Sequence, residues 1–174
     1  MLGPDRVELD SARWVTLGIH GLFLVLLVLA VVRADASGAL GVGLLIAAWY
    51  IAGMYLRRTR SATFAAVWVL GLSAVWSVAT LAVAPDFVWL AFPLFFLLLF
   101  LLSTPIGLVA VAIVTIIAVV GLDHDGNLEV GEVVGPTIGA GFAIVFTLAY
   151  RALANEHRRT KQLLAELVET RGRL

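Results

Sequence analysis

Apolar runs of bilayer length constrain the fold of this chain more than any other feature of its sequence. A helix that crosses a hydrocarbon core of about 30 Å needs roughly 20 apolar residues. The sequence contains six such runs, at residues 14–32, 39–56, 62–84, 87–102, 106–122 and 133–150. With 61% hydrophobic and only 14% charged residues, the chain is far from the composition of a water-soluble domain. We therefore predict an all-α integral membrane protein, a six-span helical bundle.

The basic residues predict the topology, because cytoplasmic loops are enriched in Arg and Lys. The least marked boundary is the turn at residues 103–105, where no charge separates two apolar runs. If the chain turns there, eleven of its twelve basic residues lie on one side and only Arg33 on the other. If residues 87–122 crossed once, the split would be seven to five. Six spans with both termini in the cytoplasm are therefore predicted. The preference for Arg over Lys and the excess of Ala, Val and Leu suggest a GC-rich bacterial genome, so the expected location is a bacterial inner membrane.

This topology divides the chain into three parts. Residues 1–13 form a cytoplasmic N-terminal tail, residues 14–150 form the six-span domain, and residues 151–174 form a cytoplasmic helix. A formal net charge of zero provides no electrostatic field that attracts nucleic acid, so no nucleic-acid partner is expected. The partners expected of the apolar spans are membrane lipids. The sequence has no cysteine and no cluster of His, Asp or Glu within the spans. We therefore assign no catalytic and no cofactor-binding residue.

Four polar side chains inside the predicted spans are candidates for a function. His20 is six residues into the first span, and an ionisable group at that depth suggests a functional role. The alternative is a neutral imidazole that is hydrogen-bonded to Thr16 or to a neighbouring helix. Ser73, Ser77 and Thr80 share one face of the third span by their spacing. We expect them to form hydrogen bonds between helices, with a polar substrate path as the alternative.

Small residues recur every four positions around the start of the sixth span, at Gly131, Gly135, Gly139 and Ala143. Such a ridge lets another helix backbone approach closely. It predicts close helix packing, either within the chain or across a dimer. Pro136 is expected in the first turn of this helix, where its missing N–H costs little.

The polar segment at residues 121–132 is similar in outline to the calcium-binding loop of an EF-hand. Acidic residues stand at loop positions 3, 5, 9 and 12, with glycine at position 6, but position 1 has no carboxylate. The sequence therefore gives a candidate divalent-cation site, with a polar turn between two helices as the alternative. Its candidate ligands are Asp123, Asp125, Glu129 and Glu132.

The C-terminal segment predicts a long helix, because residues 142–171 contain neither Gly nor Pro. Apolar residues and one threonine follow a heptad pattern among charged side chains, which predicts a two-stranded coiled coil. The alternative is an amphipathic helix on the membrane surface. The chain stops within this helix, so we expect a further segment after it. The coiled-coil positions are Leu153, Thr160, Leu163, Leu167 and Leu174.

Short-looped spans followed by EHRRTKQLLAELVETRGRL resemble the membrane-input half of a bacterial two-component sensor histidine kinase. Within that family, the resemblance is to the class paired with helix-turn-helix response regulators. It implies a homodimer whose coiled coil leads to a kinase core outside these residues. ATP, Mg²⁺ and the response regulator would bind through that core. His157 precedes Arg158 where the phosphoacceptor motif has an acid, so no catalytic role is transferred to it.

Two functions from different classes follow. The first is a signal-input module that responds to bilayer thickness, to a lipid-like ligand between spans, or to a cation at the polar loop. Residues 87–102 form a run near the minimum length, which would make it sensitive to thickness. The second is a stand-alone membrane scaffold or transporter subunit with a coiled-coil docking tail.

Overall fold

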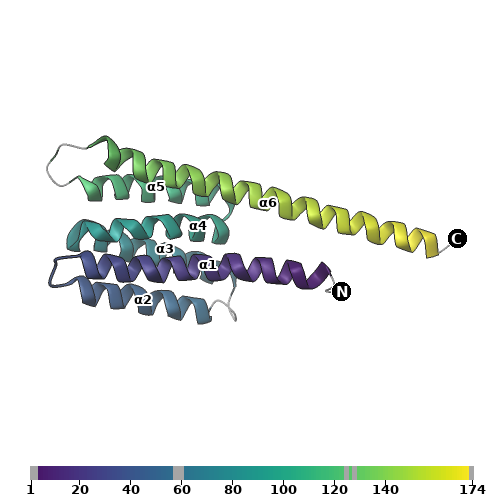
Figure 1. Ribbon diagram of the computed structural model, residues 1–174, viewed down its shortest axis with the longest axis horizontal. Coiled ribbons are helices and arrows are strands. Elements are labelled where there is room, and N and C mark those ends of the chain that lie inside the picture. The colour runs from purple at the N-terminus through teal and green to yellow at the C-terminus, as the bar shows by residue number, and fades with distance from the viewer. Residues whose placement is uncertain (1–3, 57–60, 124–125, 127–128, 173–174) are drawn as a thin grey trace.

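The computed structural model describes residues 4–56, 61–123, 126 and 129–172. This part of the chain is an all-helical bundle without a strand (Figure 1). The N-terminal part of the first helix and the C-terminal part of the last helix project from the same side of the bundle. The elements are α1 (Pro4–Arg33), α2 (Ala39–Leu56), α3 (Ala62–Val78), the π-helix η2 (Ala79–Val83), the 3₁₀-helix η3 (Pro85–Leu90), α4 (Ala91–Leu101), α5 (Thr104–Leu122) and α6 (Val130–Gly172).

The predicted membrane character is confirmed by the length and composition of the helices. Within the part of the chain that the structure describes, four segments are long and apolar enough to cross a bilayer. Large apolar side chains on their outer faces, such as Leu40 and Ile116, are more than half exposed, as expected for a surface that meets hydrocarbon. Two further apolar segments, Leu17–Arg33 and Pro85–Leu101, are shorter. The four long segments are Ala39–Leu56, Ala62–Val83, Thr104–Leu122 and Val130–Leu164.

The centre of the bundle is α4, which contacts α1, α3, α5 and α6. Eight of its eleven residues are buried. The run predicted as a fourth span begins as η3, whose 3₁₀ turns rise more per residue, so that η3 and α4 together reach about 28 Å. Trp76 of α3 donates its indole N–H to the Phe87 carbonyl at 2.8 Å and fixes η3 in place. Most of the short run that we expected to be sensitive to bilayer thickness is therefore covered by other helices.

The last helix starts earlier than the sequence predicts. The Glu129 N–H donates to the Glu132 carboxylate at 3.0 Å. This is the capping-box hydrogen bond from the backbone of the N-cap residue to the side chain three residues later. This cap places the first turn at Val130, so Pro136 lies inside the helix and not in its first turn. The proline therefore leaves the Glu132 carbonyl without its usual intrahelical donor.

The prediction of one unbroken helix through residues 142–171 is confirmed, since α6 runs for 43 residues to Gly172. A helix of that length extends over about 64 Å, roughly twice the thickness of the hydrocarbon core. Its C-terminal half projects beyond the other helices (Figure 1). At the other end of the chain, α1 begins at Pro4, so the predicted N-terminal tail is helical from that residue onward.

Candidate functional site

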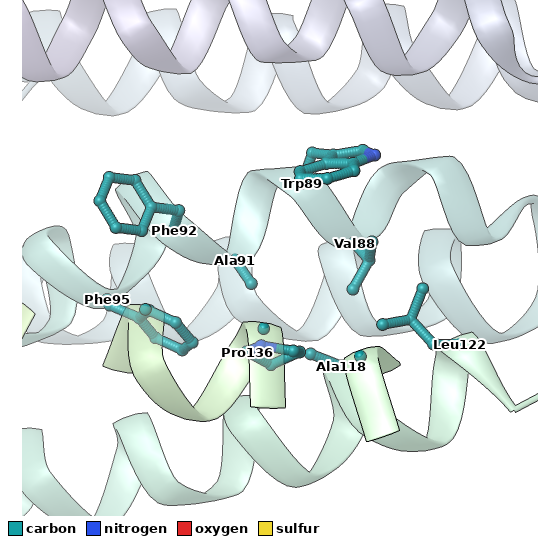
Figure 2. A pocket seen from close by; sticks show the side chains of 11 residues that line it. Val88, Trp89, Ala91, Phe92, Phe95, Ala118, Leu122 and Pro136 are labelled. Carbon is teal, nitrogen blue, oxygen red and sulfur yellow. The ribbon is translucent and has the colours of Figure 1, made fainter. Parts of the chain in front are cut away.

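An apolar pocket of about 220 Å³ lies between η3, α4, α5 and the N-terminal part of α6 (Figure 2). Aromatic side chains of η3 and α4 form one wall, among them Trp89, Phe92 and Phe95. Ala118 of α5 and Pro136 of α6 line it from the other side. None of its lining residues carries a charge, so the pocket suits an apolar ligand and offers no group for acid–base chemistry.

The predicted glycine ridge forms part of this pocket. A Cβ atom added at Gly131 or Gly135 would meet nothing within 4 Å, and both residues line the pocket. Farther along α6, a Cβ at Gly139 would touch the Phe92 ring at 3.4 Å, and Ala143 is fully buried. Gly139 and Ala143 are therefore packed within the chain. Gly131 and Gly135 have no close neighbour in the single chain, and packing of the ridge across a dimer stays a prediction.

His20 has its partner on the neighbouring helix. Its Nδ1 shares a hydrogen bond with the hydroxyl of Tyr50 on α2, and the two rings meet edge to face. Tyr50 is 1% exposed and stacks on Phe23 with 4.0 Å between ring centroids. The alternative of an imidazole bonded to another helix is therefore confirmed, and this pair joins α1 to α2.

Replacing Tyr50 by Phe is expected to weaken the α1–α2 contact by about 1 kcal/mol, because it removes one buried hydrogen bond but keeps the stacked ring. The free energy of unfolding in detergent micelles measures the effect. Tyr55→Phe is the matched control, since Tyr55 lies on the same helix and is 66% exposed. Equal stability of the two variants would contradict a structural role for the His20–Tyr50 bond.

Two tryptophans make a reciprocal contact between α2 and α3 that the sequence analysis missed. The Trp68 indole N–H donates to the Trp49 carbonyl at 3.0 Å, and the Trp49 indole N–H donates to the Trp68 carbonyl at 3.2 Å. The Trp68 ring occupies the space beside Gly53, where a side chain would overlap it. Gly53 within an apolar run was the available signal of close packing, but a glycine alone does not indicate which side chain packs against it.

The three hydroxyls predicted to bond between helices donate within their own helix. Ser73 bonds to the Val69 carbonyl, Ser77 to the Ser73 carbonyl and Thr80 to the Trp76 carbonyl, at 2.8 to 3.0 Å. The prediction of interhelical bonds from these donors is wrong. The carbonyl one turn earlier in the same helix lies close to such a side chain, so it competes with acceptors on other helices.

Arg151 of α6 anchors that helix to the turn between α4 and α5. Its guanidinium donates to the Thr104 hydroxyl at 2.7 Å, to the Leu102 carbonyl at 3.3 Å and to the Leu99 carbonyl. These carbonyls end α4, where helical acceptors lack intrahelical donors and favour a cation. The sequence identified Arg151 only as a marker of topology, because its partners lie about 50 positions away in the chain.

The carboxylates of the candidate cation loop make local contacts. Asp123 accepts the Gly126 N–H at 2.8 Å, and Glu132 caps α6 as described above. Asp125 lies outside the described residues, and the Glu129 side chain has no described role. Among the residues with described positions, no group of three or more metal-ligating side chains gathers. The cation site stays a prediction.

The coiled-coil positions lie on the projecting part of α6. Leu153 is 60% exposed and Leu163 is 52% exposed in the single chain, while Thr160 donates to the Glu156 carbonyl. Leu167 lies on the same helix, and Leu174 is outside the described residues. Exposed leucines on a projecting helix need a partner or a surface to bury them, which leaves the coiled coil a prediction.

The site that the geometry offers is therefore an apolar pocket at one end of α6 and an arginine anchor farther along the same helix. Comparison with known proteins adds no assignment to it. No protein-family model matches the chain, and neither the curated proteins nor the solved structures contain a significant match.

Proposed function

We propose that this chain is the membrane-embedded signal-input module of a sensor histidine kinase. In this proposal it crosses a bacterial inner membrane six times, has both termini in the cytoplasm and forms a homodimer. The observation that carries the proposal is α6, one continuous helix that lines the apolar pocket and then projects beyond the bundle. The start of α1 projects from the same end as α6, as an even number of crossings requires.

The pocket suggests the kind of input. At about 220 Å³ it is smaller than the roughly 300–1,000 Å³ of pockets that enclose drug-sized ligands. Its apolar lining and its place among membrane-spanning helices favour a hydrocarbon chain from the bilayer. A ligand shifts a conformational equilibrium only if it binds the two states with different affinity. Because α6 supplies one wall of the pocket, a displacement of α6 changes that affinity and carries the response to the projecting helix.

The proposed function is tested by the mass of the native protein in its own cells, read with an antibody against residues 151–174. A kinase requires a product heavier than 18.6 kDa by at least one further domain, typically 50–250 residues, that is phosphorylated in an ATP-dependent reaction. A product near 18.6 kDa would favour the alternative, a stand-alone scaffold or transporter subunit with a docking tail.

Filling the pocket should exclude the hydrocarbon chain. In vesicles that contain a phospholipid with a photoactivatable acyl chain, Gly135→Leu is expected to reduce labelling of η3 and the start of α4 about fivefold, because a close-packed site has no room for both groups. Gly141→Leu is the matched control, since a Cβ at Gly141 also meets nothing within 4 Å but Gly141 does not line the pocket. Equal labelling of both variants would mean that the pocket does not hold lipid.

A further inference from the structure

Thr147 of α6 is an exception among the hydroxyls of the described helices. It is 1% exposed, and its Oγ1 has no hydrogen-bond partner. Buried hydroxyls are normally hydrogen-bonded, so an unpaired one requires an explanation. Six other hydroxyls in the described helices donate to the carbonyl four residues earlier, and these belong to Ser73, Ser77, Thr80, Thr115, Thr137 and Thr160.

The next turn of α6 beyond Thr147 faces two backbone carbonyls at the end of α4. Arg151 follows Thr147 by four positions, so the two side chains share a face. Arg151 there bonds to the Leu99 and Leu102 carbonyls at the end of α4. A carbonyl oxygen accepts from a hydroxyl as well as from a guanidinium, and the charged guanidinium forms the stronger bond. The residue with the unused donor therefore precedes the residue that binds these carbonyls by one helical turn, about 6 Å along the axis.

The face of α6 that leads to Arg151 repeats with the same four-residue spacing. Gly135, Gly139, Ala143 and Thr147 follow one another before Arg151, and all except Thr147 are Gly or Ala. If α6 moves by four residues, about 6 Å along its axis, each small residue of this face takes the position that the next small residue held before. Packed helices change between such discrete registers, and one-turn shifts are an observed type of transition.

We propose that α6 has two registers against the α4–α5 turn. In the register described above, Arg151 holds the Leu99 and Leu102 carbonyls and the Thr147 hydroxyl is unpaired. In the second register, α6 has moved one turn toward its C-terminal end, the Thr147 hydroxyl donates to those carbonyls, and Arg151 leaves the turn. This inference rests on the proposed function, since it assigns the movement by which the input module would change the projecting helix.

Cysteine pairs measure the two registers in residues 1–174, which contain no cysteine. The Phe100 and Tyr150 rings have centroids 5.7 Å apart, so Phe100→Cys with Tyr150→Cys reports the register described above. Phe146 precedes Tyr150 by one turn, so Phe100→Cys with Phe146→Cys reports the second register. A short thiol-reactive crosslinker is applied to the protein in lipid bilayers. Intact-mass spectrometry then quantifies the crosslinked product, in which a crosslink within one chain leaves the mass of a monomer and a crosslink between chains gives the mass of a dimer.

Arg151→Ala is expected to raise the yield of the 100–146 pair relative to the 100–150 pair by about threefold, because it removes the donor that holds the first register. Adding Thr147→Val should return the ratio to its original value. Thr137→Val is the matched control, since that hydroxyl is on the same helix but donates to the Val133 carbonyl. An unchanged ratio in the folded Arg151→Ala variant would overturn the proposal.

Thr147→Val alone provides an independent test that does not depend on removing Arg151. It should lower the 100–146 yield below that of Thr137→Val, and equal yields would overturn the proposal. Both measurements read the register without any kinase output. Two registers in a protein that never autophosphorylates would therefore contradict the proposed function and leave the register change intact. Autophosphorylation of a protein with one fixed register would support the proposed function and overturn the register change.

Discussion

Gly53→Ala is expected to lower the free energy of unfolding by about 3 kcal/mol, at the upper end of the cost of overpacking a core. The new methyl group would overlap the indole of Trp68, which is only 6% exposed. That ring cannot turn aside without cost, because its N–H donates to the Trp49 carbonyl at 3.0 Å. The substitution therefore either breaks this bond or separates α2 from α3.

The matched control is Gly41→Ala, on the same helix. A Cβ at Gly41 meets nothing within 4 Å, so alanine should leave stability unchanged or raise it by up to about 1 kcal/mol through its higher helix propensity. Unfolding in mixed micelles, followed by helical circular dichroism, compares the two variants. Similar stability of both would contradict the reciprocal tryptophan contact as a determinant of the α2–α3 interface.

The helical class and the membrane character were predictable, because runs of apolar residues bounded by charges and prolines are a local property of the sequence. The place of each run in the bundle was not. Residues 87–102 look like any other span, yet they form the enclosed centre, with η3 as a 3₁₀ start. Enclosure depends on which helices surround a segment, and six apolar runs of similar composition do not specify their neighbours.

For single residues of the site, too, the sequence predicted local properties but not the contact partners. A hydrogen bond from His20 to a neighbouring helix was one of the alternatives, since an imidazole inside a span needs a hydrogen bond, but neither the helix nor Tyr50 could be chosen over other partners. The anchor at Arg151 was missed because two of its acceptors are backbone carbonyls, which every residue has. The glycine ridge was recognised from its spacing. Its division into a packed part and a pocket wall depends on the size of Phe92 and Phe95 across from it.

The second large effect concerns the projecting part of α6. One alanine inserted after Ala154 rotates everything beyond it by about 100° relative to the bundle, whereas seven inserted residues restore the original face to within about 20°. The insertion point lies beyond Arg151, so the anchor to the α4–α5 turn is kept. If α6 transmits the input as a rigid helix, the one-residue insertion changes the output and the seven-residue insertion preserves it.

This insertion pair tests the central claim most directly. Residues 1–174 are joined in helical phase to the dimerisation and ATP-binding domains of a histidine kinase, and ATP-dependent phosphorylation is measured in lipid vesicles. Transmission through α6 predicts at least about a fivefold change for the one-residue insertion and less than about a twofold change for the seven-residue insertion. Equal phosphorylation of both variants and of the parent would contradict a role for α6 in carrying the signal.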